Sequence, residues 1–323
     1  MLGIRAMLGS DKKGDPLVYC DLLGRKRAVM FDLGNNRLNT AQLRRVSDIF
    51  VSHTHMDHFI GFDKFLRVNL VEDHLVNIYG PPGFRANVKG KIAGYLWNLP
   101  DKLGLKFKIF EVHGNEIETE TLDSQKSFAT IDQSRIKFDG TTLLSDEQIS
   151  VKFVEMDHRT PCFSYLLEEK QTFNVRKDAL TELNLKPHAW LAALKQMATN
   201  QDYHGKSVQV EDQSFEARFL IEKLLTRKES YRIGYITDIG FVEHNLQKAE
   251  KLFSGIDVLF CESSFLHEDI DRAERTYHLT TTQAATIAKR CKVKKLIPFH
   301  ISKRYMNVPK VLAEIRREFE AIG

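Results

Sequence analysis

The segment FVSHTHMDHFIGFD, from Phe50 to Asp63, constrains this chain more than any other part of its sequence. An apolar strand over Ile49–Ser52 would end at this segment, and alternate side chains of a strand share a face. The chain then turns into an expected helix, where later side chains point in other directions. One zinc ion takes about four ligands, whereas ligands spread around a turn can reach two ions about 3.5–4 Å apart, as in two-metal hydrolases. The potential ligands in this turn are His53, His55, Asp57 and His58.

Three later segments each place one further candidate ligand just beyond an apolar run and before a turn. VKFVEMDHRTP carries His158 in this position, RIGYITDIG carries Asp238, and KKLIPFHISKRY carries His300. Each residue taken alone could be a turn cap or a core histidine. Because the carboxyl ends of strands are where ligand sites assemble in α/β folds, the three together with the first cluster predict a single metal centre.

Apolar runs alternate with amphipathic stretches along the chain, which predicts an α/β fold of sheets covered by helices. We expect a single domain over residues 1–323, with a charged and largely helical insertion at about 171–229 that projects from it. Strands are expected at Ala28–Asp32, Ile49–Ser52, Leu75–Tyr79, Val151–Met156, Phe163–Leu167, Arg232–Thr237, Asp257–Cys261 and Leu296–Phe299. Helices are expected at about Phe59–Val71, Phe84–Trp97, Val242–Phe253, Thr281–Arg290 and Val308–Ala321.

The composition is that of an ordinary globular enzyme, with 42% hydrophobic and 28% charged residues. The formal net charge of +4 permits an anionic partner without requiring one. No apolar run is long enough for a membrane span, and the N-terminal segment lacks the apolar stretch of a secretion signal. The four cysteines form no CxxC pair. We therefore expect a reduced, cytoplasmic protein with no membrane partner.

Five motifs occur here in the order in which a known family carries them: SHTHMDH, IYGPPGF, YITDIG, YHLTTTQAA and FHISKRY. From about Ala28 to Tyr305 the chain resembles the metallo-β-lactamase superfamily and, within it, the ribonuclease Z branch, whose members process tRNA 3′ ends. The resemblance implies an αββα sandwich of two similar halves with an arm-like insertion.

The resemblance also implies two zinc ions, or another divalent transition metal, and a place for each candidate ligand. One zinc would take His53, His55 and His158. The other would take Asp57, His58 and His300, and Asp238 would bridge the two. Such ions activate water for attack on phosphorus near neutral pH.

Three residues carry catalytic roles by the same resemblance. Asp57 would orient the attacking water. His278, in the His-x-Thr motif, would act as an acid to the leaving oxygen or stabilise charge on the phosphoryl oxygens. Glu262, in CESSF, would support His278 by fixing its orientation.

Two parts of the sequence depart from the branch's pattern. GSDKKGDPLVY stands where the branch has a Pro-x-Lys-x-Arg-Asn loop that helps to hold the RNA 3′ end. The insertion corresponds to the family's tRNA-gripping arm, but its expected tip reads NLKPHAWLAALK, with His188 after Pro187 instead of a glycine-proline turn. We expect a helix–turn–helix arm. Its positive charge would come from Lys186, Lys195, Lys206, Arg227, Lys228 and Arg232.

The sequence leaves two substrates open for a phosphodiesterase of this kind. One is a tRNA precursor cut at its 3′ end by an endoribonuclease. The other is a small phosphodiester, such as a cyclic nucleotide, or another ester. An iron oxidoreductase of the same superfold is disfavoured by His55, where those proteins usually carry glutamate, and a β-lactamase by the lack of an export signal. The partners expected are RNA or a small ester, and a homodimer is also compatible with the family.

Overall fold

The computed structural model describes residues 3–320, which form two compact units. The first, here called the core unit, contains the chain up to Glu168 and from Arg232 onward. The second, here called the arm, is Glu169–Tyr231. Among residues 3–320 there is no helix long and apolar enough to cross a membrane.

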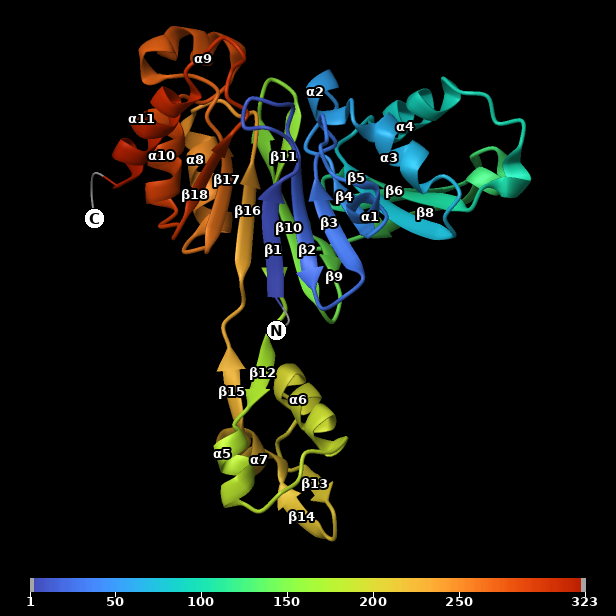
Figure 1. Ribbon diagram of the computed structural model, residues 1–323, viewed down its shortest axis with the longest axis vertical. Coiled ribbons are helices and arrows are strands. Elements are labelled where there is room, and N and C mark those ends of the chain that lie inside the picture. Colours follow the sequence, from blue (N-terminus) through green and yellow to red (C-terminus); the bar gives the residue numbers. More distant parts are fainter. Residues whose placement is uncertain (1–2, 321–323) are drawn as a thin grey trace. The chain divides into compact units, whose positions relative to one another are not determined.

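The first sheet of the core unit has eight strands that lie in sequence order, β1 to β8 (Figure 1). The strands from β3 to β6 run parallel, and the strands outside this group pair antiparallel. The strands are β1 (Gly3–Leu8), β2 (Val18–Leu23), β3 (Arg27–Phe31), β4 (Val46–Phe50), β5 (His74–Gly80), β6 (Leu105–His113), β7 (Glu116–Asp123) and β8 (Ala129–Lys137). The helices of this half are α1 (Thr40–Leu43), α2 (Met56–Phe59), α3 (Phe62–Asn69) and α4 (Phe84–Ala93).

The second sheet of the core unit has six strands in the order β18-β17-β16-β11-β10-β9. The strands β16, β17 and β18 are parallel, and the apolar sequences RIGYI and VLFCE suit strands covered on both faces. The strands are β9 (Thr142–Ser145), β10 (Ile149–Asp157), β11 (Pro161–Glu169), β16 (Arg232–Ile236), β17 (Val258–Glu262) and β18 (Leu296–Phe299). The helices of this half are α8 (Glu243–Phe253), α9 (Ile270–Thr276), α10 (Thr281–Arg290) and α11 (Val308–Glu320).

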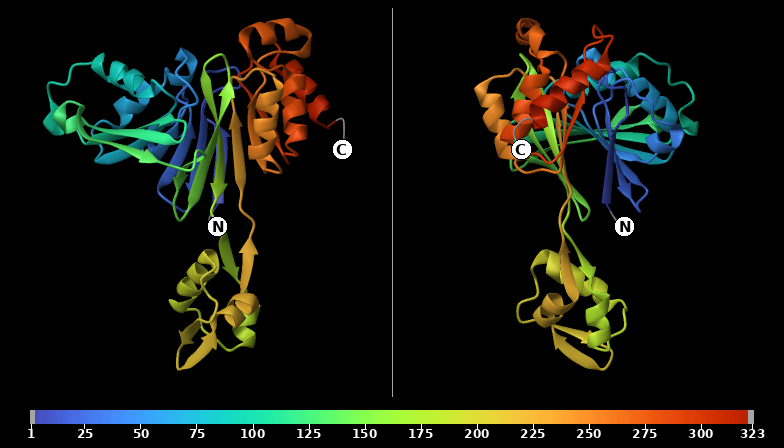
Figure 2. Two further views of the ribbon diagram at one scale, coloured as in Figure 1. Left: turned by 180° about the vertical axis from the view of Figure 1, so that it is seen from behind. Right: turned by 60° about the vertical axis from the view of Figure 1, so that its left-hand side comes forward.

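A layer of aromatic side chains joins the two sheets. Phe31 of β3 stacks on Tyr165 of β11 and Tyr235 of β16, with ring centroids 5.6 and 5.4 Å apart, and all three side chains are fully buried. The helices α1, α3 and α4 cover the outer face of the first sheet, whereas α8, α10 and α11 cover that of the second (Figures 1 and 2). The core unit is therefore the expected αββα sandwich.

The arm is a small α/β unit with its own apolar core, not the expected helix–turn–helix. Its helices are α5 (Lys177–Glu182), α6 (Trp190–Asn200) and α7 (Ala217–Leu224). Two antiparallel ladders accompany them: β12 (Thr172–Val175) with β15 (Leu225–Lys228), and β13 (Ser207–Val210) with β14 (Gln213–Glu216). In β13, buried Val208 and Val210 alternate with exposed polar residues, which is a strand period inside a segment that we expected to be helical.

Two expected helices are shorter or divided in the structure. The helix expected at Phe59–Val71 is two helices, α2 and α3, because Gly61 lies between them and approaches another backbone closely. A Cβ at Gly61 would lie 2.2 Å from Gly34 O, and Gly61 N donates to Leu33 O. The helix expected at Phe84–Trp97 ends at Ala93, where Gly94 forms the C-cap. The last helix ends at Glu320, and the expected end at Ala321 lies outside the described residues.

The eight expected strands are present, seven with shifted ends and the one at Leu296–Phe299 with the expected bounds. The sequence did not reveal β1, β2 and β6 to β9 of the sandwich. The strand β8, ATIDQSRIK, is exposed at every residue, so burial imposes no alternation on its sequence. Its place is set by pairing with β7, which a local pattern does not encode.

Candidate metal centre

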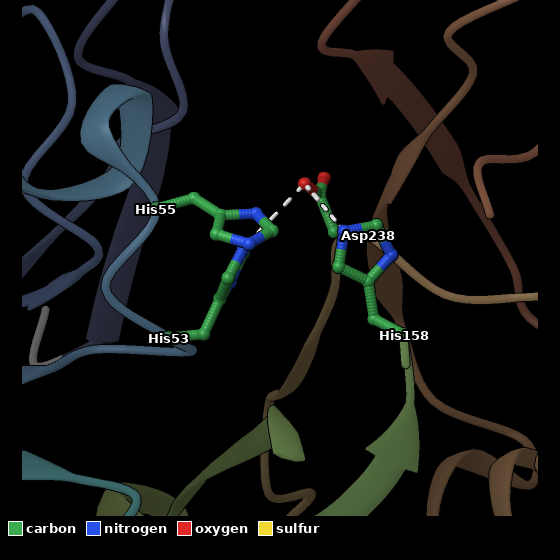
Figure 3. Close-up of side chains that lie close together, drawn as sticks. All are labelled: His53, His55, His158 and Asp238. Carbon is green, nitrogen blue, oxygen red and sulfur yellow. Dashed lines mark ion pairs between the residues drawn. The ribbon is translucent and has the colours of Figure 1, made fainter. Parts of the chain in front are cut away.

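The candidate metal ligands meet at the carboxyl ends of strands in the core unit. His53 lies beyond β4, His158 follows β10, Asp238 lies beyond β16 and His300 follows β18. The remaining three candidates, His55, Asp57 and His58, lie at the start of α2. Figure 3 shows that His53 and His55 face His158 and Asp238 across the space between the two halves of the sandwich.

The donor atoms of these side chains form two sets that could each hold a metal ion, with the atoms of a set within 4.8 Å of one another. The first set is His53, His55, His158 and Asp238, and the second is Asp57, His58 and His300. Asp238 also reaches the second set, because its Oδ2 is 3.1 Å from His58 Nε2 and its Oδ1 is 3.4 Å from His300 Nε2. One carboxylate thus lies between two histidine-rich sets.

The first set contains a buried polar atom that no protein group satisfies. His53 Nε2 has no hydrogen-bond partner in the described part of the chain, although the side chain is buried. Burial, and then the neighbouring His58, lower the pKa of His53 to about 2, so this imidazole is neutral at pH 7. A neutral imidazole with a free nitrogen is the form that binds metals. The residues present therefore fit a divalent metal ion.

Asp32, which was not among the residues expected at the site, positions His58 of the second set. It is fully buried, and its carboxylate accepts hydrogen bonds from Ser52 N, Ser52 Oγ and Tyr235 Oη at 2.6, 2.8 and 2.6 Å. Its Oδ2 lies 2.8 Å from His58 Nδ1. Because Nδ1 of His58 faces this carboxylate, the ring presents Nε2 to the centre, as ligand histidines do.

Burial lowers the pKa of His58, but the carboxylates of Asp238 and Asp32 on either side of the ring outweigh it and raise the pKa well above its usual value. The second set thus attracts positive charge, which a divalent cation would supply.

One turn of the chain positions two of the site histidines. His158 Nδ1 donates to the carbonyl oxygen of Tyr277 at 2.7 Å, which leaves Nε2 directed at Asp238 Oδ2, 3.7 Å away. Tyr277 is the C-cap of α9 and precedes His278. The backbone at Tyr277 therefore links the orientation of His158 to the position of His278.

Three side chains of the centre stand on left-handed backbone. Asp32, Asp238 and His300 have φ angles of 58°, 43° and 56°. Residues other than glycine adopt this region at a cost of about 1–3 kcal/mol each, and such residues cluster at functional sites. These three residues lie just beyond the ends of β3, β16 and β18, and the sharp turns there direct their side chains toward one another.

Glu262 and His278 form a pair at the edge of the centre. His278 Nδ1 lies 2.9 Å from Glu262 Oε2, and Glu262 is fully buried at the end of β17. The same carboxylate accepts hydrogen bonds from Ser264 Oγ at 2.7 Å and Ile239 N at 2.9 Å. Burial lowers the pKa of His278, but the Glu262 carboxylate outweighs it and raises the pKa to about 9. The ring thus retains a proton at neutral pH.

A pocket of about 260 Å³ opens beside the centre. Asp57, His278 and His300 line it, and so does the N-terminal loop from Lys13 to Asp15. The loop is anchored near the end of β18, since Ile301 N donates to Lys12 O at 2.8 Å and Lys13 Nζ donates to Tyr305 O at 2.7 Å. The segment that lacks the branch's loop motif therefore still forms a wall of the pocket.

Every site residue expected from the sequence lies in this one region, and the structure adds Asp32, Ser52, Tyr235 and the Tyr277 carbonyl. A signal for Asp32 was present, because it ends an expected apolar strand just as the candidate ligands do. Tyr277 acts through its backbone oxygen, so no side-chain pattern could reveal it.

Similarity to known proteins extends over most of the chain. The family described as Beta-lactamase superfamily domain matches residues 204–301. A protein named Ribonuclease Z from Deinococcus radiodurans is 32% identical over 306 residues, which cover 93% of this chain and 90% of the relative. A Ribonuclease BN from Proteus mirabilis is 27% identical over 99% of this chain and 94% of that protein. A Zinc phosphodiesterase ELAC protein 1 from Bos taurus is 26% identical over 91% of this chain and 82% of its own length.

Solved structures share the fold at lower sequence identity. Human tRNase Z, short form, superposes with a TM-score of 0.52 at 20% identity, covering 94% of this chain and 92% of that one. Yeast PDE1 superposes with a TM-score of 0.55 at 11% identity, covering 98% and 93%.

The αββα sandwich and the His-x-His-x-Asp-His turn at its strand ends define a protein of the metallo-β-lactamase superfamily. The identity of 32% over nearly the whole chain is more specific: the chain belongs to the ribonuclease Z family.

Proposed function

We propose that this chain is a metal-dependent phosphodiesterase that cuts tRNA precursors at their 3′ ends as an endoribonuclease. The observation that carries the proposal is that two residues of the second metal set line one pocket together with His278, which Glu262 holds. The first set adjoins the second through Asp238. The relative named Ribonuclease Z supports RNA as the substrate.

The donor set favours zinc, because imidazole nitrogens outnumber carboxylates in it. His53, His55 and His158 would hold one ion, Asp57, His58 and His300 would hold the other, and Asp238 would contact both. When bound, the two ions would activate water at neutral pH and neutralise charge that develops on the phosphoryl oxygens. The relative named Zinc phosphodiesterase ELAC protein 1 supports the choice of metal.

The chain's own residues would orient the water and supply a proton. Asp57 lines the pocket, where its carboxylate can accept a hydrogen bond from the attacking water, and its Oδ2 also lies 3.6 Å from His300 Nε2. His278 would donate its proton to the leaving oxygen, because Glu262 holds Nδ1 and leaves Nε2 for the substrate. Glu262 would keep the ring oriented and protonated.

The arm would contribute to RNA binding, but with less positive charge than its sequence suggested. Residues 169–231 contain ten Lys or Arg and nine Asp or Glu. Within the arm, Lys206 pairs with Asp202 and Lys228 pairs with Glu169. Arg232 belongs to β16 of the core unit, where it bonds Gly255 O. Of the six basic residues expected to supply this charge, Lys186, Lys195 and Arg227 remain as candidates for phosphate contacts.

Incubation of the zinc-loaded protein with an end-labelled tRNA precursor tests the proposal. We expect one cut at the 3′ end of the tRNA body, and loss of this cut in Asp57→Ala even where circular dichroism shows an intact fold. Absence of cleavage of several precursors by the loaded wild-type protein would refute the endoribonuclease role.

A second candidate is hydrolysis of a small phosphodiester, which the modest pocket and the nearly neutral arm favour. Bis(p-nitrophenyl) phosphate, assayed beside the tRNA precursor, separates the two. Fast hydrolysis of the small diester without any cut in the precursor would decide for this candidate.

A further inference from the structure

A second groove in the core unit lies between β18 and α11. We propose that it binds the single-stranded 3′ trailer of the RNA substrate, an inference that rests on the proposed function. The groove has a volume of about 510 Å³.

The two walls of the groove are the edge of a sheet and one face of a helix. The edge strand contributes consecutive residues from Lys294 to Pro298. The helix contributes residues at helical spacing: Leu312, Ile315, Arg316, Phe319 and Glu320. The four residues of β18 rise about 3.3 Å each, so the groove is about 13 Å long. An extended chain can follow the edge of the sheet over this length.

Positive charge dominates the groove. Lys12, Lys295 and Arg316 line it, and in the range 3–320 none of these three side chains forms an ion pair. Lys294 also lines it and pairs with Asp257 at 2.8 Å, and Glu320 is the one acidic residue among the lining residues. Cationic side chains without an ion-pair partner suit the binding of a phosphate backbone, because the binding releases counterions from the nucleic acid and is thereby favoured.

The floor of the groove suits bases better than it suits an added peptide strand. Phe319 is half-buried and offers a ring on which a base can stack. The oxygen of Lys295 accepts from Leu259 N of β17, and that of Phe299 accepts from Ser263 N just beyond β17. By alternation, Leu296 and Pro298 therefore direct their backbone away from β17. Pro298 has no N–H, so a peptide strand added at this edge would lack a ladder hydrogen bond.

The groove adjoins the pocket of the candidate metal centre through the N-terminal loop. Lys12 lines the groove and the next residue, Lys13, lines the pocket. The hydrogen bond from Ile301 N to Lys12 O fixes this loop against the end of β18. A strand cut in the pocket would therefore continue past Lys13 and Lys12 toward Lys295.

The test compares Lys12→Gln/Lys295→Gln/Arg316→Gln with a control of equal charge change, Lys26→Gln/Lys102→Gln/Lys137→Gln. The control lysines are exposed and line neither the pocket nor the groove. Cleavage of precursors with a single-nucleotide trailer and with a trailer of about twelve nucleotides is measured at two salt concentrations. Thermal unfolding midpoints confirm that the variants are folded.

Loss of three phosphate contacts should lower the slope of log affinity against log salt concentration by about 2. When salt rises from about 50 to 200 mM, kcat/KM on the long trailer should therefore fall roughly 20-fold more for the wild type than for the groove variant. On the short trailer the two should agree, and the control should match the wild type on both. The inference would be overturned if the groove variant had the same reduction in kcat/KM, relative to the wild type, on both trailers, or no reduction on the long trailer. The proposed function would stand in either case.

Binding of a fluorescein-labelled oligouridylate of about twelve nucleotides gives a readout that does not need cleavage. We expect weaker binding by the groove variant than by the control. If the wild type cuts no precursor but this difference is found, the proposed function fails and the groove still binds single-stranded RNA. Unchanged binding by the groove variant would overturn the inference and favour an apolar peptide as the occupant.

Discussion

His278 Nδ1 lies 2.9 Å from Oε2 of a glutamate, Glu262, that is completely buried. Two further donors, Ile239 N and Ser264 Oγ, hold that carboxylate at the end of β17. Because Glu262 cannot move without losing these bonds, it fixes a protonated imidazole at the wall of the pocket. The pair is suited to transfer a proton to a leaving group.

Replacement of His278 by alanine should therefore lower kcat for RNA cleavage by about 10²–10⁴-fold, the usual contribution of a general acid. The loss should be much smaller for bis(p-nitrophenyl) phosphate, because p-nitrophenolate leaves without a proton. Steady-state kinetics with both substrates, with metal content measured on the same samples, checks this. Loss of bound metal from His278→Ala would show instead that His278 is a metal ligand.

Glu262→Gln should reproduce the same pattern more weakly, because the amide can still contact the ring but carries no charge to favour its protonated form. Ser264→Ala is the matched control, since it removes one bond to the same carboxylate and leaves the charge. We expect kcat for RNA to fall in the order wild type, Ser264→Ala, Glu262→Gln and His278→Ala. Equal kcat in Glu262→Gln and the wild type would contradict the positioning role.

Asp32→Asn should weaken metal binding although Asp32 is not among the candidate ligands. The amide nitrogen of Asn would face a donor of Ser52, His58 or Tyr235, so one of the hydrogen bonds that the carboxylate now accepts would be lost. Loss of such a partner lowers metal affinity by about 10–100-fold. Tyr235→Phe removes one of these bonds and should cost only about 1 kcal/mol of stability. Chelator competition measures the first effect and urea unfolding the second. Unchanged metal affinity in Asp32→Asn would contradict the account.

Four candidate ligands could be found from the sequence because each stands just after an expected apolar strand, and the other three because they follow the first of these, His53, within one turn. His53, His158 and His300 are readable in this way, whatever the topology of the sheets. The contacts among them come from pairing between distant strands, such as β16 with β11, which local patterns do not specify. The arm was misjudged because its strands β13 and β14 have four residues each, too few for a period to stand out beside three helices.

Removal of the arm should separate RNA cleavage from the chemistry of the centre. Glu168 and Arg232 are register partners on the antiparallel strands β11 and β16. An Asn-Gly turn inserted between these two residues, in place of 169–231, would close a two-residue hairpin. Cleavage of a tRNA precursor should collapse, whereas hydrolysis of bis(p-nitrophenyl) phosphate should stay within a few-fold. Full precursor cleavage by the shortened chain would show that the arm does not hold the RNA.

The central claim is that the side chains around Asp238 form a two-metal centre. Elemental analysis by mass spectrometry of the purified protein, before and after dialysis against a chelator, tests it most directly, with cleavage assayed on the same samples. The account predicts about two zinc ions per chain, as expected for a two-metal hydrolase, and loss of cleavage with their removal. Protein that contains no transition metal, yet cleaves its substrate equally well with and without the chelator, would contradict it.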